Sequence, residues 1–226
     1  ISTYATIAAK GALDAGKLQV RRDNSEDVGL AVSVCRGSCE TPHMDAVFGT
    51  PDMRGDIGCF SNVTANSTAG WVSKALEIKG ANITLTSGPN SGIQTLGYVS
   101  ELVRDGAAKQ VLAITADELY AQQLDGYEKV GYLHTGAREE NFQLNYSSEF
   151  KSVLAEGAAA ALVESMESAT ARGAEVLGEI LSFACSMDTA EFEGPSLEAD
   201  ALERAAKQAL ELANLKPADI DLVVWS

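Results

Sequence analysis

The sequence predicts an α/β protein with a layered, largely parallel sheet. Two observations lead to this class. Short runs of apolar and β-branched residues alternate along the chain with longer segments of helical periodicity. The 226 residues are 46% hydrophobic and 22% charged, a composition typical of a globular protein with a sizeable core.

The first half alternates between helices and buried strands. Ser2 can cap the first helix, and Gly16 ends it. One face of this helix carries Ile7, Ala8, Gly11, Ala12 and Ala15, and this face is expected to pack on the core. The expected elements are a helix over 2–15, a buried strand over 28–34, a loop with a short helix over 35–56, a helix over 66–78, a strand over 83–86, a tight turn over 87–90, a helix over 91–104 and a buried strand over 110–115.

The second half begins with a long polar stretch over residues 120–149, which lacks clear periodicity. Stretches of this length are usually functional or mobile. A buried strand is expected over 158–163, a strand over 176–183, a strong helix over 197–213 and a last strand over 220–225.

The charge is acidic and unevenly distributed. The chain has 17 basic and 32 acidic residues, a net charge of −15, which argues against nucleic-acid or anionic-membrane partners. Residues 1–110 carry 10 basic and 11 acidic residues, whereas residues 111–226 carry 7 basic and 21 acidic residues. An acidic partner would be repelled by the second half, so the first half suits such a partner better. No apolar run approaches the ~18 residues of a membrane span. With no secretory signal at the start, we expect a cytoplasmic protein.

The cysteines do not form a recognisable framework. Four are too few and too irregular for a disulfide scaffold. Cys35, Cys39 and His43 are spaced four apart, and Cys59 could supply a fourth metal ligand, but the spacing matches no standard zinc pattern. We therefore expect buried structural thiols, and neither a metal nor a cofactor.

The stretch from Asn62 to Glu118 is the most informative. Its strand, glycine-containing turn and helix direct backbone N–H groups and the positive end of the helix dipole to one point, where a cysteine becomes a nucleophile. Here the chain resembles the β-ketoacyl synthases of the thiolase superfamily. The matching segments are Phe60–Gly70 (F-x-x-x-V-x-N-x-x-A-G), Lys79–Thr84 (K-G-P-N-x-T), Ser91–Leu96 (S-G-L-Q-A-L), Arg104–Ala108 (R-x-G-x-A), Ala116–Glu118 (G-x-D/E), Ala155–Ala159 (G-E-G-A-A) and Ala169–Ala174 (A-x-x-R-G-A).

One departure from the family decides the expected chemistry. Where the family reads T-A-C-S-S-G, this chain reads Ser87-Gly88-Pro89-Asn90-Ser91-Gly92, so Pro89 occupies the position of the nucleophilic cysteine. Proline has no nucleophile, and it lacks the backbone N–H that in the family forms part of the oxyanion hole. Because the first turn of a helix tolerates proline, the turn is expected to persist without its chemistry. No catalytic residue is predicted.

The resemblance implies a thiolase-like fold that is incomplete at both ends. The family's catalytic histidines lie beyond the strand matching 220–225, and its first, central strand precedes residue 2. We expect an N-terminal thiolase-like half over 1–168, without that first strand, and the beginning of a C-terminal half over 169–226.

Within the family, a chain without the cysteine resembles the chain-length factor of type II polyketide synthases. This implies a non-condensing subunit that shapes the acyl tunnel. Its implied partners are a cysteine-bearing ketosynthase, or a second copy of the chain, and an acyl carrier protein. The active partner would perform decarboxylative condensation on carrier-bound malonyl units. Because carriers are acidic, as is the second half of this chain, the carrier is expected to dock mainly on the active partner.

The resemblance also suggests where the partner and the tunnel lie. Strand 83–86 would form the sheet edge and pair with its counterpart in the partner. Most candidates are apolar or aromatic, as an acyl tunnel requires, and ordinary core packing is the alternative for each. The tunnel and interface candidates are Met44, Val47, Phe48, Phe60, Val63, Asn66, Trp71, Ile83 and Thr84.

Three other functions stay open. The first is acyl chemistry that needs no cysteine, and the second is a homodimeric pseudoenzyme with only an interaction role. The third is a serine hydrolase, because residues 88–92 resemble G-x-S-x-G, with Ser91 displaced by one position. Asp117, Glu118 and Glu156 are interpreted as structural carboxylates rather than acid–base catalysts.

Overall fold

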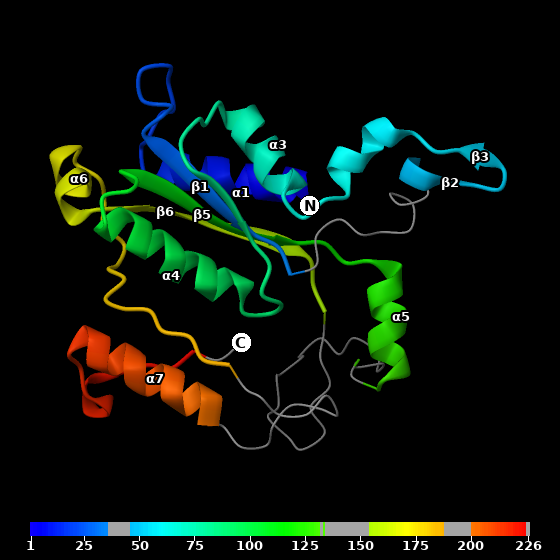
Figure 1. Cartoon of the computed structure of the whole chain (residues 1–226). Helices are drawn as coiled ribbons and strands as arrows, with labels where there is room; N and C mark the ends of the chain where they lie inside the picture. The colour runs from blue at the N-terminus through cyan, green and yellow to red at the C-terminus, as the bar shows by residue number, and fades with distance from the viewer. Residues whose placement is uncertain (36–45, 132, 134–153, 188–199, 225–226) are drawn as a thin grey trace, which may run out of the picture.

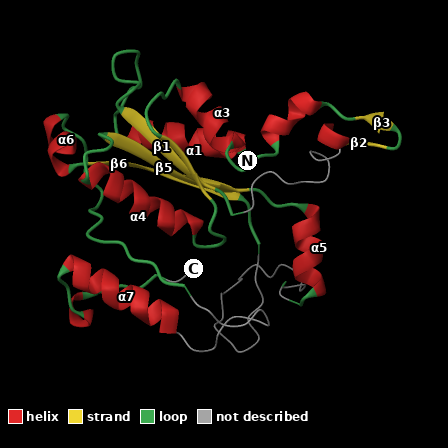
Figure 2. Ribbon diagram, in the orientation of Figure 1, coloured by secondary structure: helices red, strands yellow, loops and turns green. Residues whose placement is uncertain are grey.

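The core of the fold is a four-stranded sheet with helices on both faces (Figures 1 and 2). In the order β4-β1-β5-β6, strand β1 (Val28–Ser33) pairs in parallel with β4 (Asn82–Leu85) and β5 (Gln110–Asp117), and β6 (Gly157–Glu164) is antiparallel to β5. The expected α/β class with a largely parallel sheet is confirmed. The computed structural model describes residues 1–35, 46–131, 133, 154–187 and 200–224.

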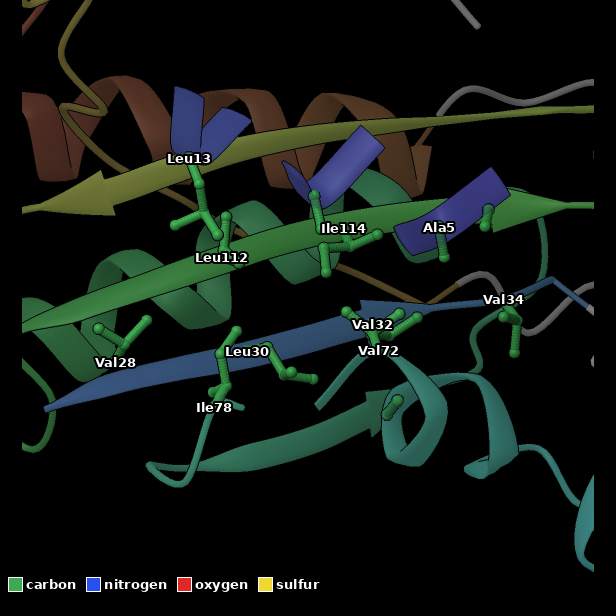
Figure 3. Close-up of a cluster of buried hydrophobic side chains, with 13 residues drawn as sticks. Ala5, Leu13, Val28, Leu30, Val32, Val34, Val72, Ile78, Leu112 and Ile114 are labelled. Atoms are coloured by element: carbon green, nitrogen blue, oxygen red, sulfur yellow. The ribbon is translucent and has the colours of Figure 1, made fainter. Parts of the chain in front are cut away.

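Strand β1 lies at the centre of the core. All six of its residues are buried, which suits a parallel strand covered on both faces. Leu30 and Val32 face α1 (Ser2–Ala15) and α3 (Ser67–Leu76) on one side of the sheet, as Figure 3 shows. Ala31 faces α4 (Ser91–Arg104) on the other side, in a second buried cluster.

The sheet is continuous between β1 and β5. Six consecutive residue pairs join the two strands, from Val28 opposite Gln110 to Ser33 opposite Thr115. The two strands are therefore direct neighbours in the described structure.

Helix α1 buries a different face from the expected one. The buried residues are Ala5, Ala9 and Leu13, whereas Ile7 is 66% exposed. Alanines occur around most of the helix, so the pattern alone is ambiguous, and packing on α3, β5 and β6 selects the face. Ser2 does not cap the helix, because Ile1 occupies the cap position without a side-chain hydrogen bond.

A small arm precedes α3 and projects from the sheet (Figure 1). It contains the two-residue strands β2 (Gly49–Thr50) and β3 (Met53–Arg54), which pair with each other, and the 3-10 helix η1 (Ile57–Asn62). The sequence predicted a loop and a short helix here, and only residues 46–48 are helical in the described part of that segment.

The second half departs more from expectation. Helix α5 (Ala121–Lys129) lies inside the long polar stretch, and β6 alternates between exposed and partly buried residues instead of being fully buried. Helix α6 (Met166–Ala171) spans the proposed boundary after residue 168, and that division stays a prediction. Helices α7 (Asp200–Ala213) and η2 (Pro217–Asp219) follow.

Residues 176–183 and 220–224 do not form the strands that were predicted. A strand is defined by hydrogen bonds to a neighbour, and neither segment has a strand partner among the described residues. Their apolar side chains are instead largely exposed, as Leu177 at 89% and Val224 at 83% show. In the described part of the chain, no helix has the length and apolar character needed to cross a bilayer.

Candidate functional site

The turn that joins β4 to α4 is closed by one side chain. The Ser91 hydroxyl accepts a hydrogen bond from the Ser87 backbone N–H at 2.7 Å and donates one to the Gly88 carbonyl oxygen at 2.6 Å. Gly88 has a φ of +64°, a conformation that glycine adopts without a steric penalty. The predicted strand, turn and helix are therefore present, and Ser91 holds them together.

Pro89 lies at the tip of this turn and is exposed. It precedes Asn90, the residue that caps α4, so it is outside the helix and not in its first turn as expected. The fixed φ of proline suits such a turn. The chemical consequence is unchanged, because position 89 offers neither a nucleophile nor a backbone N–H.

The start of α4 packs on the end of β5. A Cβ atom at Gly92 would lie 3.4 Å from Thr115 Oγ1, and the Thr95 hydroxyl donates to the Ser91 carbonyl oxygen at 2.9 Å. The positive end of this 14-residue helix is thus aimed at the carboxyl edge of the sheet. It can stabilise a negative charge there, but position 89 supplies no group to attack an acyl carbon.

Ser91 is not available as a nucleophile. It is 3% exposed, and its hydroxyl proton is donated to the Gly88 carbonyl. Both histidines of the chain, His43 and His134, lie outside the described residues. The geometry of Ser91 therefore opposes the serine-hydrolase hypothesis.

The carboxylates near this edge have structural partners, as expected. Asp117 Oδ1 accepts from the Cys35 backbone N–H at 2.9 Å. Glu156 accepts from the Tyr4 hydroxyl at 2.9 Å. This hydrogen bond is the main reason why the pKa of Glu156 lies below its usual value and the pKa of Tyr4 above its own.

The tunnel and interface candidates fall into different environments. Met44 lies outside the described residues. Val47 and Val63 are buried, whereas Asn66 is exposed, as are three aromatic side chains, Phe48 at 68%, Phe60 at 49% and Trp71 at 46%. The Trp71 indole N–H donates to Asn62 Oδ1 at 3.0 Å, which fixes the ring beside η1. Their role in a tunnel stays a prediction.

Strand β4 forms one edge of the sheet, as expected. Its candidates Ile83 and Thr84 are partly buried. Thr84 Oγ1 is a buried side-chain oxygen with no hydrogen-bond partner among the described residues, which is uncommon because such groups are costly to leave unpaired. Nothing in the sequence pattern distinguishes this threonine from other strand threonines.

The cysteine cluster can be followed only in part. Cys35 is only partly buried, and Cys185, which is outside this cluster, is exposed, so the expectation of buried thiols is wrong for both; both are free thiols. Cys39 and His43 lie outside the described residues. Among the residues that the structure describes, no group of three or more metal-binding side chains is found.

Replacing Ser91 with alanine is expected to lower the free energy of unfolding by about 1 kcal/mol, because two hydrogen bonds that close the turn are lost. Urea denaturation measures this change. Ser87→Ala is the matched control, because Ser87 contributes its backbone N–H and not its side chain. Equal losses in the two variants would contradict the assigned role of the Ser91 hydroxyl.

Comparisons with known proteins agree on one family. The model of the β-ketoacyl synthase N-terminal domain matches residues 1–169. A 3-oxoacyl-[acyl-carrier-protein] synthase 1 from Haemophilus influenzae is 26% identical over 92% of this chain and 52% of its own length. A 3-oxoacyl-[acyl-carrier-protein] synthase 2 from Coxiella burnetii is 24% identical over 97% of this chain and 54% of its own. The chain thus spans about half the length of these relatives.

Solved structures show the same fold. A β-ketoacyl synthase from Burkholderia phymatum superposes with a TM-score of 0.82 at 29% identity, over 97% of this chain and 55% of that one. The ishigamide ketosynthase/chain length factor gives a TM-score of 0.78 at 23% identity, over 97% of this chain and 54% of that one. A type II polyketide synthase acyl-carrier protein in complex with its ketosynthase gives a TM-score of 0.78 at 24% identity, over 96% of this chain and 56% of that one.

Proposed function

Because the chain belongs to the β-ketoacyl synthase family, we propose that it is a ketosynthase-like subunit that does not itself condense acyl units. One observation carries the proposal. The turn at which the family places its nucleophile is intact here, closed by Ser91, and has Pro89 at its tip. Covalent loading requires a nucleophile at that point, and proline provides none.

The subunit would then act by pairing and by shaping a tunnel, as a chain-length factor does. Support comes from β4, which is an edge strand with unpaired backbone groups on one side. Support also comes from the similarity in fold to a ketosynthase/chain length factor. A cysteine-bearing ketosynthase is the partner that would supply the missing nucleophile.

Covalent loading tests this function directly. Incubated with an acyl thioester of a carrier protein, the protein is expected to show no added acyl mass by intact-protein mass spectrometry. Pro89→Cys places a thiol at the tip of the turn, next to the positive end of α4, and is expected to become loaded. In the control Ser87→Cys, the thiol lies at the first residue of the turn, two positions before its tip, and slower loading is expected.

Stoichiometric loading of the unaltered protein would overturn the non-condensing proposal and favour acyl chemistry without the cysteine. Native mass spectrometry after co-expression with a cysteine-bearing ketosynthase tests the pairing. A 1:1 complex is expected. An exclusive homodimer would instead favour a pseudoenzyme with only an interaction role.

The acidic second half bears on the carrier protein. Residues 111–226 carry 7 basic and 21 acidic residues, which repel an acidic partner. Crosslinking a carrier protein to the complex is expected to label mainly the cysteine-bearing subunit. Predominant attachment to this chain would contradict the expectation.

A further inference from the structure

A basic hollow lies at the end of the sheet opposite the Pro89 turn. It is a depression of about 400 Å³ between the loop after α1 and the C-terminal end of α3. That loop leads into β1, and Lys79 precedes β4. Because β1 and β4 are parallel, the segments before them lie together at the amino edge, whereas the Pro89 turn follows the carboxyl end of β4.

The rim of this basic hollow is strongly cationic. Arg21, Arg22, Lys74 and Lys79 line it together with one carboxylate, Glu77, in a chain whose net charge is −15. All four cations are exposed, and no ion pair found among the described residues includes any of them. Clustered cations in a concave surface attract anions.

The cations come from segments that are fixed in place. The Arg21 backbone N–H donates to Asn24 Oδ1 at 2.7 Å, and Asn24 Nδ2 donates to the Gln19 carbonyl at 2.9 Å. The Lys79 backbone N–H donates to the Ser25 carbonyl at 2.8 Å, which ties the two segments together. A site organised in advance loses less conformational entropy when a ligand binds.

The floor and one wall of the hollow are also defined. Ser25 and Ile78, which are 2% and 3% exposed, line it alongside the cations. Lys74 belongs to the last turn of α3, where a cation offsets the negative end of the helix dipole, and its Nζ lies 5.2 Å from the centre of the Trp71 ring. The Arg21 guanidinium donates one hydrogen bond, to Gln19 Oε1 at 2.7 Å, which leaves its remaining N–H groups for a ligand.

We propose that this basic hollow binds a small anion that carries a diphosphate group. Two arginines and a lysine meet on one rim, and a guanidinium binds phosphate oxygens with two parallel hydrogen bonds. A diphosphate offers enough charge for three cations, which a single carboxylate does not. The volume is at the lower end of the ~300–1,000 Å³ that small-molecule sites occupy. This site is distinct from the turn on which the proposed function rests.

Isothermal titration calorimetry with inorganic pyrophosphate, ADP and sulfate tests the site at about 50 mM salt, where electrostatic attraction is weakly screened. Saturable binding of pyrophosphate or ADP is expected, with sulfate at least about tenfold weaker. The double variant Arg22→Gln, Lys79→Gln is expected to weaken binding by at least about tenfold. The matched control Lys10→Gln, Arg104→Gln removes the same two charge types elsewhere and is expected to leave binding unchanged.

Amide chemical shifts give a readout that does not depend on variants. Pyrophosphate is expected to move the resonances of residues 21–25 and 73–79 and to spare those of 87–92. The proposal is overturned if neither diphosphate binds saturably, if sulfate binds equally well, if the control variant loses as much affinity, or if the shifts are spread over the surface.

Discussion

Replacing Glu164 with glutamine is expected to lower the free energy of unfolding by about 3 kcal/mol, because it breaks a largely buried ion pair. The Glu164 side chain is 7% exposed and that of Arg172 is 20% exposed. Arg172 Nε lies 3.0 Å from each carboxylate oxygen, and the Ser168 hydroxyl and the Gln110 amide also donate to the carboxylate. Arg172 further donates to the carbonyl of Gly16, at the end of α1. One pair therefore connects α1, β5, β6 and α6.

Glu164→Gln is also expected to change how the free energy of unfolding depends on pH. Burial alone raises the pKa of Glu164, but the hydrogen bonds from Arg172, Ser168 and Gln110 outweigh it and hold the pKa below its usual value. The unfolded chain then binds the proton more readily than the folded chain. Stability from this group is present above the pKa of an ordinary carboxyl and is lost as the pH falls through the lowered value. Glu164→Gln removes this contribution.

Urea denaturation from about pH 7 to about pH 2 measures both effects, because the loss begins near the pKa of an ordinary carboxyl, about 4.3, and continues below it. The control is Glu203→Gln, which breaks the exposed pair of Glu203 and Lys207 on α7, and it is expected to have a far smaller effect because exposed pairs contribute little. A comparable loss in both variants would contradict the importance given to the Glu164–Arg172 pair.

Gly97→Ala is expected to lower the free energy of unfolding by about 2 kcal/mol through overpacking, although alanine has a higher helix propensity than glycine. Alanine alone would stabilise the interior of α4 by about 1 kcal/mol relative to glycine. However, a Cβ atom at Gly97 would lie 2.1 Å from Phe183 Cγ, so the ring must move off the helix. Urea denaturation measures the effect.

Two controls isolate this contact. At Gly92, in the same helix, a Cβ atom would meet Thr115 at an ordinary distance of 3.4 Å, so Gly92→Ala is expected to be neutral or stabilising. In the double variant Gly97→Ala, Phe183→Ala, the ring is absent, and the cost of the added methyl group should disappear. Stabilisation by Gly97→Ala alone would show that Phe183 does not rest on α4.

Local signals predicted the first half of the fold well. Helix α4 begins at Ser91 and ends at Arg104 as expected, because its turn residues and its apolar spacing agree. The run from Val28 was correctly predicted as a buried strand. The buried face of α1 was wrong, since alanine-rich helices carry little pattern and Leu13 reaches the core only because α3 and β5 lie where they do.

The second half shows why strands are harder to predict. Residues 176–183 have the composition of a strand, but a strand also needs a neighbour, and local sequence does not contain that neighbour. At the candidate site, the sequence correctly predicted a turn before the helix, but it placed Pro89 in the first helical turn, whereas Pro89 lies before the capping residue Asn90. It missed that the Ser91 hydroxyl closes the turn, because this contact depends on the conformation of Gly88.

The hydrogen bonds that close the turn at residues 87–90 do not involve the side chain at its tip. Gly88 supplies the unusual backbone conformation and Ser91 supplies the closing hydrogen bonds, while Pro89 points to the surface. Other residues at position 89 would therefore leave the hydrogen bonds that close the turn in place. Under the proposed function, a codon change at this position alone would separate a subunit that can be acylated there from one that cannot.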